Sequence, residues 1–304
     1  MNRNAADTTH NLTAAFGPNQ LQVSRLGFGG ATAGLTNYID AYDAAHPANR
    51  ETMLAALRHA VELGVTYFDT APGYGDGLAE TIFGEALQGA PVFLATKVPL
   101  SAAGQVRQSL EASLRRLRRD RIDLLQLHGT SYGADEEVIV LRPDGMLQEL
   151  TQLKDEGLIG LAGFTSEDNN AAVYRFIASG GFDVMQLCYN VMHQHPYDST
   201  RPFGSLIEAK RRGMSTVTMR TATSGVFQRW IQAANPANTF DYTEALIQFV
   251  LSNPLVDVAL VGMRDIPTVE TNVRIWRDVA NRIDIPALQA RYVGPAANAS
   301  DHGS

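Results

Sequence analysis

Four ionisable side chains in the first half of the sequence have types and positions that suit proton transfer. Asp69, Lys97 and His128 each end a short apolar run, and Tyr74 follows Asp69 in a glycine-rich turn. Burying a lysine in an apolar strand is costly without a carboxylate partner, so we expect Lys97 to pair with Asp69. An ammonium group beside a phenol favours the phenolate, so we expect Lys97 to lower the pKa of Tyr74. Tyr74 could then protonate a carbonyl oxygen or deprotonate an alcohol, with His128 orienting the same oxygen.

Each of these residues taken singly also has an ordinary structural explanation. Asp69 could cap a helix, Tyr74 could be a loop aromatic, Lys97 could end an exposed strand, and His128 could be a hydrogen-bonded core histidine. These explanations account poorly for the joint placement of the four groups at the ends of successive apolar runs. The set therefore indicates one site that polarises a carbonyl group and needs a hydride partner.

The elements that would position these groups alternate along the whole chain. Eight short β-branched or apolar runs predict strands: Ser24–Gly30, Val65–Asp69, Val92–Lys97, Ile122–His128, Ile159–Phe164, Val184–Asn190, Ser215–Met219 and Val256–Gly262. Helical periodicity predicts helices between them: Arg50–Leu63, Leu78–Leu87, Gln105–Arg119, Met146–Glu156, Asn169–Ser179, Pro202–Arg212, Tyr242–Ser252 and Thr268–Ala280. The alternation, with no linker, predicts an α/β fold, a single (β/α)8 barrel whose chemistry lies where strands end.

An N-terminal hairpin and two tails complete the expected organisation. Ala15–Gln22, which contains Gly17-Pro18-Asn19, predicts a β-hairpin that closes the bottom of the barrel. We expect polar tails at both ends of the chain, at Met1–Ala14 and at about 294–304, which includes His302. We therefore expect one domain with an ordered core of about 15–292.

Composition and charge exclude several classes of function. The chain has 304 residues, 45% of them hydrophobic, and a net charge of −7. Its basic cluster at 115–119 falls on one face of an expected helix, so neither nucleic acid nor a membrane is an expected partner. The single cysteine, Cys188, lies in an apolar run and reads as a buried, reduced thiol. With no membrane-length apolar stretch and no signal pattern at the N-terminus, a cytoplasmic protein is expected.

Several segments together resemble the aldo-keto reductase family. They are Phe68–Gly75 with Glu80, Gly84–Leu87, Ala95–Lys97 and Asp123–His128, and the resemblance continues from Leu26 to Asn272. Asp69, Tyr74, Lys97 and His128 match the family's tetrad in order and spacing. The resemblance implies a hydride transfer between a nicotinamide dinucleotide and a carbonyl or alcohol, with Tyr74 as general acid and base.

The resemblance also implies how the dinucleotide is held. The family binds it in extended form without a Rossmann domain, which agrees with the lack of a GxGxxG fingerprint here. Thr165, Ser166 and Gln186 match the residues that meet the carboxamide. The full set of residues expected at the cofactor is Gly30, Thr165, Ser166, Gln186, Met219, Arg220, Thr221, Ser224, Gly225, Gly262, Arg264, Thr268 and Asn272.

Some positions depart from the family pattern. Met219 stands where an aromatic usually stacks on the nicotinamide, and methionine offers no π face. Arg220 could meet a phosphate or a polar substrate, or form a surface pair with a carboxylate. Arg264 could bind a 2′-phosphate bidentately, whereas Thr268 and Thr271 replace residues that many members carry there. The balance slightly favours NADP(H) over NAD(H).

The expected substrate is less defined. A long segment at 35–49 could form a rim or lid, and aromatic and polar residues of other loops could line the same mouth. The candidates are Tyr38, Tyr132, Met192, His193, Phe227 and Trp230. Such a mouth suits an aldehyde, a ketone or a sugar-like or cyclic alcohol. The same side chains could instead pack a helix or a subunit contact.

Two other classes of function remain open at this point. A cofactor-binding regulatory or accessory subunit with little turnover is compatible with Met219 and the altered adenosine loop. A metal- or phosphate-dependent lyase or isomerase has thin support in Ser224-Gly225 and Gly262. His193 and His195 lack a third ligand in register, so no metal is expected.

Overall fold

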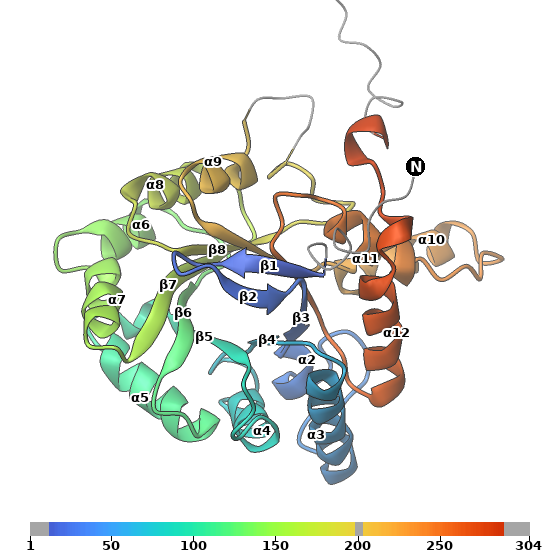
Figure 1. Cartoon of the computed structure of the whole chain (residues 1–304), viewed down its shortest axis with the longest axis horizontal. Helices are drawn as coiled ribbons and strands as arrows, with labels where there is room; N and C mark the ends of the chain where they lie inside the picture. Colours follow the sequence, from blue (N-terminus) through green and yellow to red (C-terminus); the bar gives the residue numbers. More distant parts are fainter. Residues whose placement is uncertain (1–11, 198–202, 289–304) are drawn as a thin grey trace, which may run out of the picture.

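A computed structural model describes residues 12–197 and 203–288 of the chain. Eight parallel strands form a closed barrel in the order β10-β3-β4-β5-β6-β7-β8-β9, with helices around them (Figure 1). The strands are β3 (Leu26–Gly29), β4 (Tyr67–Asp69), β5 (Phe93–Pro99), β6 (Ile122–His128), β7 (Ile159–Ser166), β8 (Val184–Cys188), β9 (Ser215–Met219) and β10 (Val258–Val261). The expected (β/α)8 barrel is confirmed, while its extent as one domain of about 15–292 stays a prediction.

All eight expected helices are present, with ends displaced by a few residues. They are α3 (Pro47–Glu62), α4 (Leu78–Ala86), α5 (Val106–Leu117), α7 (Met146–Asp155), α8 (Ala171–Ser179), α9 (Ser205–Arg211), α11 (Thr243–Leu251) and α12 (Ile266–Arg277). The sequence analysis missed α2 (Ala31–Gly34), α6 (Ala134–Leu141), α10 (Val226–Ala234) and the short helices η1 (Leu100–Ala102), η2 (Thr223–Gly225) and η3 (Val279–Asn281). α6 buries only Val140 and lacks the apolar stripe that reveals a helix. α10 does repeat apolar residues at helical spacing, at Val226, Phe227, Trp230 and Ile231, and was missed because this segment was taken as a loop.

The N-terminal hairpin closes one end of the barrel. Its antiparallel strands are β1 (Thr13–Phe16) and β2 (Leu21–Ser24), which cross the centre of the ring of strands in Figure 1. Phe16 is fully buried and packs edge-on against Tyr67 and Phe93, with ring centroids 5.4 and 5.2 Å apart. The hairpin is confirmed, although it starts at Thr13, inside the stretch expected as a tail. The expected strand Ser24–Gly30 divides at Arg25, because Ser24 belongs to β2 and β3 begins at Leu26.

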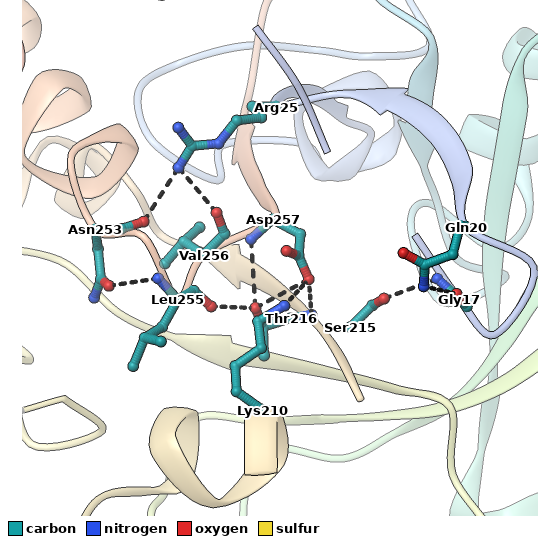
Figure 2. Close-up of polar contacts among 10 residues, drawn as sticks. All are labelled: Gly17, Gln20, Arg25, Lys210, Ser215, Thr216, Asn253, Leu255, Val256 and Asp257. Carbon is teal, nitrogen blue, oxygen red and sulfur yellow. Dashed lines mark hydrogen bonds and ion pairs between the residues drawn. The ribbon is translucent and has the colours of Figure 1, made fainter. Parts of the chain in front are cut away.

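Polar contacts beneath the barrel join the strands at its seam (Figure 2). Arg25, just before β3, donates to the carbonyl oxygens of Asn253 and Val256, just before β10, at 3.1 and 3.0 Å. The Asp257 carboxylate accepts the Thr216 backbone N–H at 2.8 Å, which ties β10 to β9. These contacts satisfy backbone groups on both sides of β10, towards β3 and towards β9.

The rest of the chain adds two general facts. No helix in the two described stretches is long and apolar enough to cross a membrane. Cys188 is a free, buried thiol, as the sequence indicated. The remaining expected tail residues, 1–11 and 294–304 with His302, lie outside the described residues.

Candidate active site

A cavity of about 300 Å³ opens at the carboxyl ends of the barrel strands. It gathers residues from segments far apart in the chain, since parallel strands all end on one rim. The expected residues that line it are Gly30, Tyr38, Asp69, Tyr74, Lys97, His128, Thr165, Gln186, Met219, Arg220, Thr221, Ser224, Gly225 and Gly262. The four ionisable groups singled out in the sequence therefore share one cavity.

Lys97 and Asp69 form a buried ion pair on the neighbouring strands β5 and β4. Lys97 Nζ lies 2.6 Å from Asp69 Oδ1 and donates to the Thr70 carbonyl oxygen at 2.8 Å. The two residues are 1% and 2% exposed, so water does not screen the pair. Burial lowers the pKa of Lys97, but the charges of Asp69 and Tyr74 outweigh it and raise that pKa above its ordinary value. Lys97 is therefore a protonated ammonium at neutral pH.

A glutamine on β6 continues this network across the barrel. Gln126 Nε2 donates to Asp69 Oδ2 and to Gln186 Oε1 of β8, both at 3.1 Å. Gln126 is fully buried, and its own Oε1 has no hydrogen-bond partner. The side chain thus links the ion pair to Gln186, which lies in the cavity wall.

Tyr74 is positioned by a tight contact between two backbone segments. The Tyr74 backbone N–H donates to the Ala71 carbonyl oxygen at 3.2 Å. A methyl group on Gly34 of α2 would lie 2.2 Å from the Tyr74 carbonyl oxygen, and one on Gly75 would lie 2.3 Å from the Gly34 carbonyl oxygen. Only glycine allows this approach, and Gly75 also has a positive φ of 68°. The Lys97 ammonium lies 5.1 Å from the centre of the Tyr74 ring.

The expected direction of the Tyr74 pKa shift is wrong for this structure. Burial raises the pKa of Tyr74 above its ordinary value near 10, and Asp69 adds to that effect. The charge of Lys97 and its hydrogen bond to Tyr74 lower the pKa but do not outweigh burial. The sequence analysis considered only the ammonium and not the loss of water around the phenol. Tyr74 is therefore a neutral phenol that can donate a proton.

His128 lies beside Tyr74 at the end of β6. The two rings meet edge to face with centroids 5.6 Å apart. Burial, and then the positive charge of Lys97, lower the pKa of His128 to about 4. His128 is therefore neutral at pH 7 and offers one N–H donor and one acceptor nitrogen.

Of the three residues expected at the carboxamide, two line the cavity and one does not. Thr165 and Gln186 line the cavity, whereas Ser166 is fully buried and donates to the Asp168 carbonyl oxygen at 2.9 Å. The Thr165 hydroxyl already donates to the Gly129 carbonyl oxygen at 2.7 Å. Gln186 Nε2 donates to the Met219 sulfur at 3.9 Å, and a thioether is a weaker acceptor than the carbonyl oxygens that Thr165 and Ser166 use.

The loop after β9 has an unusual backbone. Arg220, Thr223 and Ser224 all have positive φ, at 57°, 58° and 50°. Non-glycine residues rarely take this conformation, and strain of this kind concentrates at functional sites. Arg220 lines the cavity and forms an ion pair with Glu167 at 2.6 Å. Of the two alternatives for Arg220, the structure shows the carboxylate pair, here at the rim of the site.

The residues expected at the adenosine end lie beyond the cavity wall. Arg264 follows β10 and contacts Asp40, while its guanidinium lies 4.1 Å from the Tyr42 ring centre. The Thr268 backbone N–H donates to the N-cap residue Asp265 at 2.8 Å, and Asn272 is buried within α12. None of the three lines the cavity, although Gly262 of the same segment does.

Only one of the six expected substrate residues lines the cavity. Tyr38 does so. Tyr132 is buried, and its hydroxyl donates to the Thr165 carbonyl oxygen at 2.9 Å. Phe227 and Trp230 belong to helix α10 rather than to a loop, and Trp230 is 64% exposed. Met192 and His193 also lie outside the wall, in the turn closed by the Asn190–His193 bridge.

Several wall residues were missed by the sequence analysis. Gly129 and Thr130 follow β6, Glu167 follows β7, and Thr32 lies on α2. The first three occupy strand ends, so the rule that located Asp69 could have found them. Thr32 lies on a four-residue helix with no sequence signal, and its buried hydroxyl oxygen has no hydrogen-bond partner. In the described part of the chain, no group of three or more His, Cys, Asp or Glu residues could hold a metal.

The fold and the site define a class, a (β/α)8 barrel with a Tyr, Lys, Asp and His cluster where its strands end. The sequence model of the Aldo/keto reductase family matches residues 25–290, so the chain belongs to that family of oxidoreductases. L-galactose dehydrogenase of Arabidopsis thaliana is 27% identical over 85% of this chain and 86% of its own. Methylglyoxal reductase YeaE of Escherichia coli is 49% identical, over 30% of this chain and 34% of its own.

Solved structures share the fold. An aldo/keto reductase from Klebsiella pneumoniae in complex with NADP and acetate matches with a TM-score of 0.71 and 24% identity, over 94% of this chain and 96% of that one. The holo form of the aldo-keto reductase AKR11C1 from Bacillus halodurans matches with a TM-score of 0.68 and 23% identity, over 92% and 94% of the two chains. At these identities the likeness concerns the barrel itself.

Proposed function

We propose that the protein is a nicotinamide-dependent oxidoreductase that interconverts a carbonyl and an alcohol. The observation that carries the proposal is the neutral phenol of Tyr74 in one cavity with the buried Lys97–Asp69 pair and neutral His128. A proton donor, a fixed positive charge and a neutral N–H donor are the groups that reduction of a carbonyl requires.

Each side chain has a defined part in reduction. The Tyr74 hydroxyl donates its proton to the carbonyl oxygen, and the Lys97 ammonium stabilises the tyrosinate that remains. Asp69 holds Lys97 in place, and the His128 N–H donates a hydrogen bond to the same oxygen. A bound nicotinamide would supply the hydride, or accept it in the reverse direction. In that direction the tyrosinate takes the proton of the alcohol.

The cavity has features that fit a dinucleotide. Thr32 Oγ1 at its wall, and Nε and Nη2 of Arg264 near Gly262, are buried polar atoms without hydrogen-bond partners. Such groups are costly unless a ligand or water satisfies them. We assign the Gln186 amide to the carboxamide, Thr32 to the diphosphate and Arg264 to the adenosine end. The NADP complex of the Klebsiella pneumoniae reductase supports the same cofactor class.

We further propose small carbonyl or alcohol substrates and a cytoplasmic location. The named relatives act on L-galactose and methylglyoxal, which supports an aldehyde, a ketone or a sugar-like alcohol here. Tyr38 and Ile39 supply apolar surface at the mouth of the cavity. The single cysteine, free and buried, agrees with a reducing compartment.

The Tyr74→Phe variant tests the mechanism. Turnover of a carbonyl substrate should fall at least about 100-fold, because the proton donor is lost, while NADPH and NADH bind as before in a fluorescence titration. Tyr174→Phe, which removes a hydroxyl from α8 outside the cavity, should leave turnover unchanged. Undiminished turnover in Tyr74→Phe would contradict the mechanism. Dinucleotide binding without turnover in the unmodified protein would favour an accessory subunit.

A further inference from the structure

One loop lies along the rim of the cavity and contacts Arg264. This strap, residues 35–46, follows α2; its Leu35, Tyr38 and Ile39 line the cavity. Farther along, Asp40 and Tyr42 contact Arg264. The strap therefore connects the catalytic cavity to the segment that we assign to the adenosine end.

The strap holds Arg264 on two sides. Arg264 Nη1 donates to Asp40 Oδ1, and the guanidinium carbon lies 4.1 Å from the centre of the Tyr42 ring. The strap is folded back for this contact, because the Asn37 N–H donates to the Tyr42 carbonyl oxygen at 2.9 Å and the Tyr42 N–H to Asn37 Oδ1 at 3.0 Å. The Arg264 side chain is 19% exposed, whereas that of Asp40 is 64% exposed.

The remaining donors of Arg264 are unused. Its Nε and Nη2 atoms are buried and have no hydrogen-bond partner. A guanidinium binds a phosphate best through two parallel N–H groups and an unopposed positive charge. Asp40 occupies the third nitrogen, Nη1, so a dianionic phosphate on Nε and Nη2 would share the guanidinium with a carboxylate. A phosphate on Arg264 would therefore have to displace Asp40 or accept its repulsion.

We propose that Asp40 is a specificity-determining residue that lowers the affinity of Arg264 for the 2′-phosphate of NADP(H) and so shifts the discrimination of the protein towards NAD(H). The inference rests on the proposed function, in which Arg264 faces the adenosine end of the dinucleotide. It opposes the preference for NADP(H) that Arg264 alone suggests. The Tyr42 ring stacks on the guanidinium and holds it in place, so the charge of Asp40 can be removed without displacing Arg264.

The Asp40→Asn variant tests this role directly. The amide keeps the shape of the side chain and removes its charge, and the exposed position makes loss of folding unimportant. Titration with NADPH and NADH by fluorescence should show the ratio of NADPH to NADH affinity rising about tenfold, or 1.4 kcal/mol. NADH affinity should stay within about twofold, because NADH lacks the phosphate.

Two further variants locate the effect. Asp43→Asn removes a charge from the same strap, but Asp43 accepts the Ala45 N–H and has no contact with Arg264, so it should leave the ratio unchanged. Adding Arg264→Met to Asp40→Asn should abolish the gain, since the phosphate then has no partner. Titrations with adenosine 2′,5′-bisphosphate and 5′-AMP, which report binding without turnover, should repeat the pattern.

The possible outcomes distinguish the role of Asp40 from the proposed function of the protein. An unchanged affinity ratio in Asp40→Asn, an equal gain in Asp43→Asn, or a gain that survives Arg264→Met would each overturn the role of Asp40 while leaving the oxidoreductase proposal intact. Binding of neither dinucleotide by the unmodified protein would overturn the proposed function and this inference with it.

Discussion

At the scale of single residues, the site depends on charges placed out of reach of water. Lys97 and Asp69 are nearly inaccessible, and each is the main charged partner of the other. Breaking such a pair from one side leaves an uncompensated buried charge, whereas removing both charges together is often tolerated. The two substitutions should therefore not be additive.

We expect Lys97→Met to lower the free energy of unfolding by about 3–5 kcal/mol, because Asp69 is left with the neutral amides of Gln126 and Gln186 and no positive charge. The double variant Lys97→Met with Asp69→Leu should lose less than the sum of the two single losses. Urea unfolding of the four proteins measures the difference. Strict additivity would show that the pair does not act as a unit.

Protonation of His128 makes the free energy of unfolding depend on pH. Its pKa is about 4 in the folded protein, below the ordinary value of 6.5 that it takes in the unfolded chain, so the unfolded chain binds a proton more readily between these values. Stability due to neutral His128 is present above pH 6.5 and falls as the pH drops towards 4. From pH 7 to pH 5 the loss should be about 2 kcal/mol.

Urea unfolding at the two pH values should show that His128→Gln loses less stability in acid than the unmodified protein. His59 supplies a control of opposite sign, since its hydrogen bond to Glu62 raises its pKa. Replacing His59 should not reduce the acid loss. An equal acid loss with and without His128 would contradict its low pKa.

At the scale of elements, a short helix and a turn, rather than a long helix, position the proposed proton donor Tyr74. Tyr74 belongs to no helix or strand, and its place is set by the contact of Gly34 with Gly75. Gly34→Ala would bring a methyl group to 2.2 Å from the Tyr74 carbonyl oxygen, so the loop must shift.

We expect Gly34→Ala to lower kcat at least about tenfold, because a displacement of about 1 Å costs that much in a positioned reaction. Circular dichroism should show an intact barrel. Gly64→Ala is the matched control, since Gly64 has a φ of 87° and open space around it at the far end of α3. Gly64→Ala should lower stability and leave kcat unchanged. A lower kcat in Gly64→Ala together with an unchanged kcat in Gly34→Ala would show that the contact at Gly34 does not position Tyr74.

At the scale of the whole molecule, the cavity of the proposed active site and the stabilising hairpin lie at opposite ends of the barrel. The cavity lies where the strands end, while the hairpin seals the other end with Phe16 among the rings of Tyr67 and Phe93. Mutations at the hairpin should therefore change stability without changing the reaction.

Phe16→Ala should lower the free energy of unfolding by about 3–5 kcal/mol, because a fully buried ring leaves a cavity. The turnover of the folded enzyme should stay close to that of the unmodified protein. Leu21→Ala on the same hairpin removes a side chain from a residue that is 47% exposed, and should cost little. Loss of turnover in folded Phe16→Ala protein would show that the two ends are coupled.

The order of elements and the cluster of Asp69, Tyr74, Lys97 and His128 in one cavity could be predicted from sequence because both depend on local patterns. Apolar runs predicted every barrel strand, and the strand-end rule brought Asp69, Lys97 and His128 to one rim, although β5 continues past Lys97 to Pro99. α6 escaped the same reasoning because it has no apolar stripe and buries only Val140. α10 has apolar residues at helical spacing, and the same reasoning could have found it.

Only the tertiary structure decided what depends on burial and on contacts between distant segments. Burial raises the pKa of Tyr74, where the sequence predicted a lower value. Trp230 lies on α10 and Tyr132 donates to the Thr165 carbonyl oxygen, so neither lines the expected mouth. Asp40 contacts Arg264, which lies 224 residues later in the chain. Periodicity reports which face of an element is apolar. Desolvation and charge pairing depend on which elements meet, and that is settled only when the barrel closes.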